Sequence, residues 1–282
     1  MSVRLHFGSG SSGVALDVLP DSLRGPAEPY LGGVSLLEEA RAHAASQTAQ
    51  FPGETPATSF SVSTLAEVHR HLRAVHETGA QVSFLDFHSH GGPGSLSIGS
   101  ELLRPYHWPQ FEEHQSAFAS NARIEFHGCN VAEDDDGEIF LVKCAWHVLR
   151  PNGGTAVGHR GYALSTRAWG LDTSTPSYLG GEVVAEIASG GHPRLHNAIR
   201  LVPSVLRAEA DDFERLAQRR LARCTAAQRQ DLTRVLRLVG LARRDTHAGA
   251  AYTALYGASQ YLRNARSLLR SAGAIPPTPL RY

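Results

Sequence analysis

Hydrophobic and polar positions in the first part of the chain follow two different periods. Residues 3–7 alternate between polar and apolar side chains, which is typical of a strand. Over residues 65–75 the apolar side chains recur three or four positions apart, which predicts one face of a helix. Ser63 or Thr64 can cap the start of this helix, and Gly79 stands where a left-handed residue commonly ends one.

The same two patterns continue as far as residue 158. Short apolar runs predict strands and one small hairpin, over residues 81–90, 95–103, 122–129 and 155–158. Helical spacing predicts helices over residues 108–120 and 136–149. Stretches rich in Gly, Ser, Thr and Pro predict loops over residues 8–13, 52–63 and 172–181. This alternation favours an α/β fold with a mostly parallel sheet sandwiched by helices, in which functional residues gather at the carboxyl ends of the strands.

After residue 200 the pattern becomes entirely helical. Apolar spacing predicts three helices, over residues 204–222, 226–243 and 247–271. The charge changes at the same place, from 12 basic and 21 acidic residues before position 200 to 15 Arg and 6 acidic residues from there on. We therefore expect an α/β domain over residues 1–199 and an Arg-rich α-helical segment over 200–282. The helices are expected to dock on the acidic domain and to offer a surface for a protein partner.

Composition limits the class of protein. Of the 282 residues, 42% are hydrophobic and 19% are charged, which supplies a core and argues against a disordered chain. No apolar run reaches the ~18 residues of a membrane helix, so no membrane partner is expected. The N-terminus lacks the basic start and apolar centre of a signal peptide. Cys129, Cys144 and Cys224 are few and widely spaced, which predicts a reducing, cytoplasmic location without disulfides.

The strongest candidate for chemistry is a pair of strand ends. One predicted strand ends in His88 and His90, followed by Gly91, and the next strand ends in His127 and Cys129. If one crossover joins them as neighbouring parallel strands, His90 and Cys129 lie side by side at the same edge of the sheet. Cysteine reacts as its thiolate and needs a base or cation nearby, which His90 would supply. The amides of Gly91 and Cys129 are then the expected oxyanion hole.

Two longer segments around these residues resemble a known group of peptidases. The matching positions are Ser89-His90-Gly91, Pro93-Gly94, Leu96 and Gly99 in the first segment, and Gly128-Cys129-Asn130 and Ala132 in the second. They are similar to segments of the caspase-like clan of cysteine peptidases, which includes caspases, metacaspases, gingipains, separase and bacterial CHAT-domain proteins. The closest resemblance, over roughly residues 80–160, is to a bacterial caspase-like domain found in large surface and repeat proteins.

The resemblance implies a cysteine endopeptidase that acts on protein or peptide substrates and needs no cofactor or metal. In this clan the histidine is the general acid and base and the cysteine is the nucleophile, which carries over to His90 and Cys129. The residue two before the cysteine often lines the first specificity pocket, and here that residue is His127. Asp86 is a further candidate for the wall of the substrate site.

Several alternatives stay open. Cys129 can instead be a packing residue, in which case the domain is a catalytically inactive binding or signalling module. His88, His90, His127 and Cys129 also offer three nitrogens and one sulfur, which is a donor set for a metal-dependent hydrolase. His88 and His127 can equally form a hydrogen-bonded pair below the site.

Two charged features have simple structural explanations. Residues 134–136 are three aspartates before a predicted helix, where they can cap the helix and complement its dipole; a calcium-assisted loop or an acidic wall for a basic substrate is the alternative. The arginines of residues 200–282 are mixed with acidic residues and lack interleaved aromatic residues, which argues against a nucleic-acid partner.

Overall fold

The computed structural model describes residues 2–9, 40–42, 44–46, 49, 58–161, 163–164, 177–178, 180–247 and 249–276. The chain divides into two compact units, Met1–Asn197 and Ala198–Tyr282. This division lies two residues from the boundary expected from the change of charge. Within the described ranges, no helix is both long enough and apolar enough to cross a bilayer.

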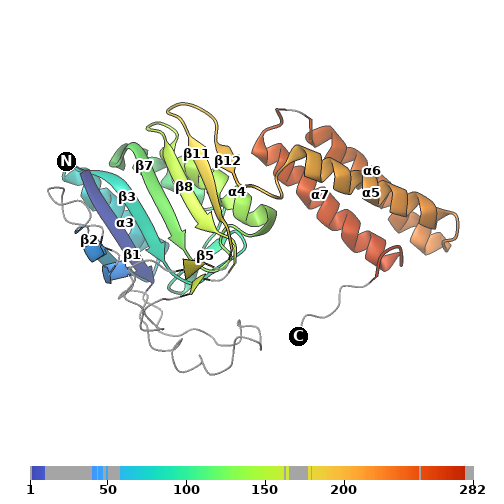
Figure 1. Ribbon diagram of the computed structural model, residues 1–282, viewed down its shortest axis with the longest axis horizontal. Coiled ribbons are helices and arrows are strands. Elements are labelled where there is room, and N and C mark those ends of the chain that lie inside the picture. Colours follow the sequence, from blue (N-terminus) through green and yellow to red (C-terminus); the bar gives the residue numbers. More distant parts are fainter. Residues whose placement is uncertain are drawn as a thin grey trace, which may run out of the picture. The chain divides into compact units, whose positions relative to one another are not determined.

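The first unit is built on a sheet with the strand order β12-β11-β8-β7-β3-β1-β2 (Figure 1). Five of these strands pair in parallel: β1 (Ser2–Ser9), β2 (Thr58–Val62), β3 (Gln81–His88), β7 (Phe118–His127) and β8 (Gly154–His159). Two antiparallel strands extend the sheet, β11 (Glu182–Ile187) and β12 (Arg194–His196). The predicted class is confirmed: a mixed α/β protein with a mostly parallel sheet flanked by helices and with C-terminal helices.

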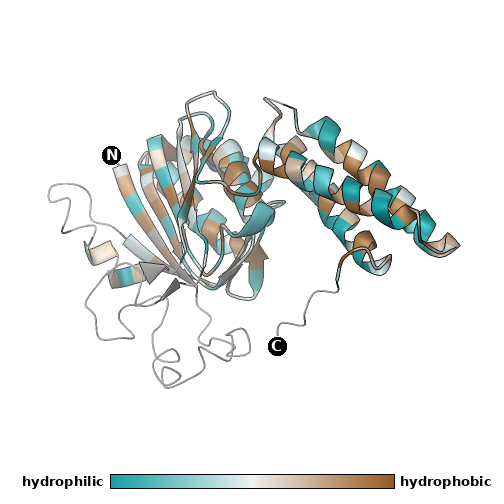
Figure 2. Cartoon of the chain, turned by 45° about the vertical axis from the view of Figure 1, so that its right-hand side comes forward, coloured by the Kyte–Doolittle hydropathy of each residue, from teal (hydrophilic) through white to brown (hydrophobic). Residues whose placement is uncertain are grey.

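One face of this sheet is apolar across its central strands. The register aligns Phe87 of β3 with Phe7 of β1 on one side and Phe126 of β7 on the other, and all three side chains are buried. Trp108 and Phe140 cover this row, with ring centroids 5.7 and 4.9 Å from that of Phe126. They come from η3 (Trp108–Ala117) and α4 (Asp134–Cys144), and α3 (Leu65–Glu77) contacts both η3 and β3. Figure 2 shows how hydrophobic and hydrophilic residues alternate along the strands.

The helix predicted from residues 65–75 is α3. The Oγ1 atom of its N-cap, Thr64, accepts a hydrogen bond from the Glu67 amide at 3.2 Å. Gly79 has a φ of 72° just beyond the helix end, as expected for the residue that ends it.

A small antiparallel sheet follows β3 directly. It orders β4 (Gly91–Gly92), β5 (Ser95–Ile98) and β6 (Glu101–Leu103), which confirms the hairpin predicted over 95–103. Leu96 and Ile98 of β5 are buried in the main core. A third sheet pairs β9 (Ala163–Leu164) with β10 (Ser177–Tyr178).

The helix predicted over residues 108–120 is wrong in type and length. The segment forms the 3-10 helix η3, which ends at Ala117, and β7 already begins at Phe118. Its buried side chains recur every three positions, at Trp108, Phe111, His114 and Ala117. A helix of three residues per turn aligns all four toward the core, whereas an α-helix would turn part of them away.

Other boundaries also differ from the prediction. The loop predicted over residues 52–63 contains the strand β2. The helix predicted over 136–149 begins earlier as α4 and ends in a π-helical turn, η4 (Ala145–Leu149). The antiparallel strands β11 and β12 were not predicted at all. Of the other two predicted loops, residues 10–13 and most of 172–181 lie outside the described residues.

Within its described residues, the second unit forms a bundle of three helices. They are α5 (Pro203–Leu221), α6 (Ala226–Asp245) and α7 (Tyr252–Ser271), and each contacts the other two. A capping box begins α6, in which Thr225 and Gln228 bond each other's backbone amides at 3.3 and 3.0 Å. Leu232, Val235 and Val239 form the buried face of α6, as their spacing predicts.

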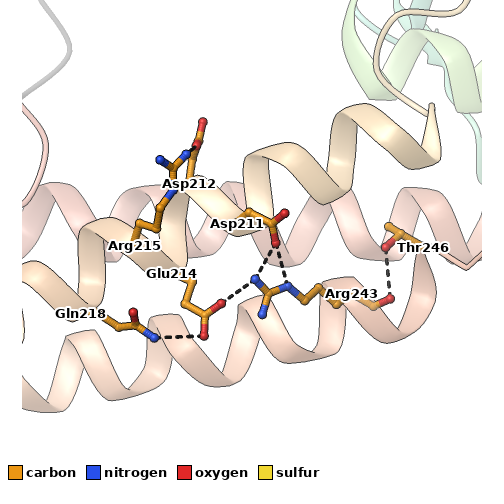
Figure 3. Close-up of polar contacts among 7 residues, drawn as sticks. All are labelled: Asp211, Asp212, Glu214, Arg215, Gln218, Arg243 and Thr246. Carbon is orange, nitrogen blue, oxygen red and sulfur yellow. Dashed lines mark hydrogen bonds and ion pairs between the residues drawn. The ribbon is translucent and has the colours of Figure 1, made fainter.

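Arginines of the bundle form ion pairs with acidic residues of neighbouring helices (Figure 3). Arg243 of α6 donates to Asp211 of α5 at 3.1 and 2.5 Å and lies 2.5 Å from Glu214 of α5. Arg266 of α7 pairs with Glu209 of α5. Part of the excess positive charge is therefore balanced inside the bundle, and docking of the helices on the first unit stays a prediction.

Two histidines join α3 to η3. The Nδ1 atom of His69 lies 2.7 Å from the Nε2 atom of His114, so one ring donates a hydrogen bond to the other. Burial, and then the proximity of His69, lower the pKa of His114 from 6.5 to about 4. Protonating both rings would break this bond and place two positive charges in contact.

We expect the free energy of unfolding to decrease as the pH falls from about 6.5 to about 4. The unfolded chain protonates His114 near pH 6.5, whereas the folded chain does so only near 4, so protons favour the unfolded state in this window. For one proton the slope approaches about 1.4 kcal/mol per pH unit. Urea unfolding at several pH values should show a shallower slope for His114→Gln than for the unmodified protein. Equal slopes would contradict this assignment.

Candidate active site

The parallel pairing of β3 with β7 sets the position of the candidate site. Their register pairs Asp86 with Glu125 and His88 with His127, and the bonding continues beyond the strand ends, because Ser89 N–H donates to the His127 carbonyl at 3.1 Å. The prediction that these two strands are adjacent and parallel is therefore confirmed. The segments that carry His90 and Cys129 leave the sheet side by side at its carboxyl edge.

Two glycines allow these segments to touch. A Cβ atom on Gly91 would lie 2.7 Å from the Cys129 carbonyl oxygen and 2.5 Å from the Cγ2 atom of Val131. A Cβ atom on Gly128 would lie 3.1 Å from the Ser89 carbonyl oxygen. The first contact is shorter than a Cβ atom can make with a backbone oxygen, so position 91 requires glycine, and the second is tight enough to favour glycine at position 128. The glycines thus bring the backbone after His90 directly against the backbone at Cys129.

The hairpin of β4 and β5 fixes the backbone around His90. The Ser97 amide donates to the His90 carbonyl at 2.8 Å, and Gly91 pairs with Leu96. The bond from Ser97 to His90 makes these two residues a hydrogen-bonded pair of the antiparallel ladder. The next pair, Gly91 and Leu96, is then of the non-hydrogen-bonded type, so the Gly91 N–H points away from β5. Because this amide is not part of the pairing with β5, it stays a candidate donor for the oxyanion hole.

The loop after Cys129 is held by the last residue of β8 and by the segment that follows it. The Asn130 amide donates to the Gly161 carbonyl at 2.7 Å, and the Ala132 amide donates to the His159 carbonyl at 3.1 Å. Asn130 has a φ of 58°, a left-handed conformation that asparagine tolerates better than most residues. Cys129 therefore lies in a turn fixed on both sides.

The three thiols have different surroundings. Cys129 and Cys224 are partly exposed, and Cys144 is buried in the core. Burial raises the pKa of the Cys144 thiol well above its usual value, which suits a cysteine that packs in the core. The Sγ atom of Cys224 lies 3.3 Å from the Leu221 carbonyl oxygen.

A layer of four polar side chains, three of them buried and Glu125 partly buried, lies one residue pair below the strand ends. Asp86 and His88 of β3 face Glu125 and His127 of β7 on the sheet side opposite the aromatic core. The imidazole rings stack with centroids 4.6 Å apart and planes inclined by 24°. The Nε2 atom of His88 lies 3.1 Å from Oδ2 of Asp86, and the Nε2 atom of His127 lies 3.1 Å from Oε2 of Glu125. Each histidine thus has a carboxylate of its own strand as partner.

Two members of this layer, His127 and Glu125, both have lowered pKa values. Burial lowers the pKa of His127. Burial also lowers the pKa of His159 on β8, which falls to about 4. Burial alone would raise the pKa of Glu125, but the hydrogen bond and charge of His127, together with Arg123, lower it to about 2. The ring of His159 is stacked 6.4 Å from that of His127 and extends the layer to the next strand.

Asp86 does not fit the substrate wall for which the sequence suggested it. Its carboxylate is fully buried and lies against His88, so it has no surface to present to a substrate. His127 is 4% exposed and is engaged by Glu125, and its role in a specificity pocket stays a prediction. The rings of His88 and His127 stack on each other, and the predicted hydrogen bond between them stays a prediction.

The four metal ligands suggested by the sequence, His88, His90, His127 and Cys129, do not form one group of neighbouring ligand atoms among the described residues. Among the described residues, two groups of three or more metal-binding side chains have their ligand atoms within 4.8 Å of one another. One group joins Asp86, His88 and His127, and neither group contains His90 or Cys129.

The aspartates at 134–136 occupy the first turn of α4, as predicted. Their place at the positive end of the helix dipole is favourable. The N-cap itself is Glu133, which makes no side-chain capping bond, so the capping part of the prediction is wrong.

Sequence reasoning missed Glu125 and His159 as members of the polar layer. The signal for Glu125 was present, because both strands carry an acidic residue, a phenylalanine and a histidine in succession, Asp86-Phe87-His88 and Glu125-Phe126-His127. His159 carries no comparable local signal, since only the pairing of β7 with β8 brings it near His127.

Comparison with known families assigns no activity to the chain. A family model described as a domain of unknown function (DUF4347) matches residues 57–151, about a third of the chain. The matched range is similar to that family and contains both strand ends with His90 and Cys129. No curated protein and no solved structure matches the chain.

We expect Cys129 to be the most reactive of the three thiols. Cys224 is the matched control because it is also partly exposed. If His90 stabilises the thiolate, iodoacetamide should alkylate Cys129 at pH 7 on the order of tenfold faster than an ordinary thiol. His90→Ala should remove this advantage, and mass mapping of the alkylated peptides measures it. Equal rates at Cys129 and Cys224, unchanged by His90→Ala, would mark Cys129 as a packing residue.

Proposed function

We propose that this protein is a cysteine endopeptidase of the caspase-like type, acting on protein or peptide substrates through His90 and Cys129. The observation that carries the proposal is the close contact between the two strand ends, where Gly91 and the Cys129 carbonyl leave no room for a side chain. This contact places a partly exposed thiol and a partly exposed imidazole at the same edge of a parallel sheet.

In the proposed first step, the thiolate of Cys129 attacks the carbonyl carbon of the scissile peptide bond. A bond forms between Sγ and carbon, and the carbon–nitrogen bond breaks as the leaving amine takes a proton from His90. The product is an acyl-enzyme thioester and a peptide with a free amino terminus.

In the second step, His90 accepts a proton from water, and the resulting hydroxide attacks the thioester. The Sγ–carbon bond breaks, the peptide leaves as a carboxylic acid, and the thiolate is regenerated. No step requires a redox change, so no cofactor is part of the proposal.

Backbone amides are proposed to stabilise the negative oxygen in both steps. The Gly91 N–H points away from β5, and the Cys129 N–H is the second candidate donor. Donors of this kind act without rearrangement during the reaction, because the hairpin and the turn already fix their direction.

The resemblance of the two segments to caspase-like peptidases supports this proposal. Both segments fall in the range that matches the DUF4347 model, whose function is itself unknown. A cytoplasmic location, and a protein partner for the C-terminal helices, stay predictions. The metal hydrolase built on His88, His90, His127 and Cys129 is not proposed, because their ligand atoms do not form one group.

The proposal predicts separate effects of two substitutions on peptide cleavage. Cys129→Ala should abolish cleavage of a mixed peptide library, because no other group can form the acyl-enzyme. His90→Ala should lower kcat/KM by about 10²–10⁴-fold, the usual contribution of general acid–base catalysis. Mass spectrometry of the library products provides the measurement and the cleavage preference together.

Cys224→Ser is the matched control and should leave the rate unchanged, since Cys224 belongs to the second unit. Thermal unfolding of each variant separates loss of chemistry from loss of fold. Absence of cleavage by the unmodified protein, or cleavage that persists in Cys129→Ala, would contradict the proposal; the first result would favour an inactive binding module.

A further inference from the structure

The two central strands present the same pair of potential metal ligands in register. Asp86 and His88 are two positions apart on β3, and Glu125 and His127 are two positions apart on β7, so all four side chains project from one face. The register places acid beside acid and histidine beside histidine. Four ligand-bearing side chains therefore converge in a fully or largely buried layer of the first unit.

The distances between these ligand atoms fit a tetrahedral metal ion. Oδ2 of Asp86 lies 3.1 Å from Nε2 of His88 and 3.7 Å from Nε2 of His127, and Nε2 of His127 lies 3.1 Å from Oε2 of Glu125. A zinc ion with nitrogen and oxygen ligands at about 2.0–2.2 Å holds neighbouring ligand atoms about 3.3–3.6 Å apart. The observed separations bracket this range, so small side-chain movements would suffice.

Hydrogen bonds alone account for these contacts less completely. The two 3.1 Å contacts are ordinary hydrogen-bond distances, but both rings direct the same nitrogen, Nε2, toward one oxygen of Asp86. An Nε2–H of His127 can donate to only one carboxylate, Asp86 or Glu125. A cation between them would satisfy all the facing lone pairs at once.

The charges in this layer also favour a bound cation. Asp86 and Glu125 are paired across the strands, and Asp86 is fully buried. Two carboxylates taken out of water side by side are costly unless positive charge lies close to them. Arg123 pairs with Glu125 and supplies one such charge, and a dication would supply the rest.

We propose that Asp86, His88 and His127, whose ligand atoms all lie within 4.8 Å of one another, bind one divalent transition-metal ion of the zinc class, with Glu125 as a neighbouring carboxylate beside His127. Two imidazole nitrogens with carboxylate oxygens favour zinc-class ions over calcium or magnesium, which prefer oxygen ligands alone. The ion would connect β3 to β7 below His90 and Cys129 and stabilise their register. This site has a structural role and stands independently of the proposed peptidase activity.

The group of His69, Glu113 and His114, between α3 and η3, provides a matched control. Its ligand atoms also lie within 4.8 Å of one another, but His69 Nδ1 and His114 Nε2 are only 2.7 Å apart, which suits a hydrogen bond and is too short for two ligands of one ion. Glu113 is exposed, unlike the ligands of the buried group.

The test measures metal binding directly. Protein stripped with a chelator should bind one equivalent of Zn²⁺ per chain by calorimetry, and Zn²⁺ should raise its melting temperature. His88→Gln should lower the affinity at least tenfold, because it removes a ligand without changing charge, whereas His114→Gln should leave it unchanged. Zinc binding that is absent, or that His114→Gln removes and His88→Gln does not, would overturn the proposal.

Cobalt substitution keeps the test decisive if His88→Gln does not fold. Co²⁺ added to the stripped, unmodified protein should give visible absorption bands of a tetrahedral nitrogen–oxygen site, without a near-ultraviolet thiolate-to-cobalt band. A strong thiolate band that Cys129→Ser removes would assign the ion to Cys129 and refute the ligand set proposed here. Because neither readout uses peptide cleavage, failure of this site and failure of the peptidase proposal are distinguishable.

Discussion

The in-register pairing of β3 with β7 is the constraint on which the candidate site depends. It sets His88 opposite His127 and continues into the bond from Ser89 N–H to the His127 carbonyl, so both chains leave the sheet together. A slip of one residue would turn the side chains of either strand to the opposite face. His127 and Glu125 would then face Trp108 and the other aromatic residues of η3 and α4, where their polar atoms would find no partners. The same register therefore determines both the core and the chemistry.

The two faces of these strands differ because alternate residues meet different neighbours. Phe87 and Phe126 stack beneath the helices with centroids 5.5 Å apart and add apolar burial, which stabilises the parallel pairing. The other face buries acids and histidines, which are favourable only when each has a partner of suitable charge or hydrogen-bonding capacity. A metal ion, proposed above, would meet this requirement within the layer, leaving His90 and Cys129 at the partly exposed edge.

Local patterns predicted most of the parallel part of the fold, and with it the meeting of two strand ends. Apolar runs such as 81–90 identified strands, whereas the close backbone contact made possible by Gly91 and Gly128 became visible only in the structure. The sequence did not predict that η3 is a 3-10 helix. Packing of Trp108 and His114 against α3 and the sheet selects its period of three, and no local signal distinguishes such a segment from an α-helix. The short antiparallel strands β11 and β12 depend on pairing with β8, which no local pattern encodes. The burial of Asp86 could not be read from sequence either, since a carboxylate two positions before a histidine is compatible with either face.

The central claim is that the chain brings residue 90 and Cys129 within reach of one another. Dibromobimane tests it directly, because this reagent fluoresces strongly only when two neighbouring thiols alkylate both of its arms. In a Cys224→Ser background, His90→Cys should give a fluorescent cross-link to Cys129, located by mass spectrometry. Arg70→Cys, an exposed position on α3 at the opposite face of the sheet, should not. Separate single alkylation of Cys129 and of the cysteine introduced at position 90, without fluorescence, would contradict the account.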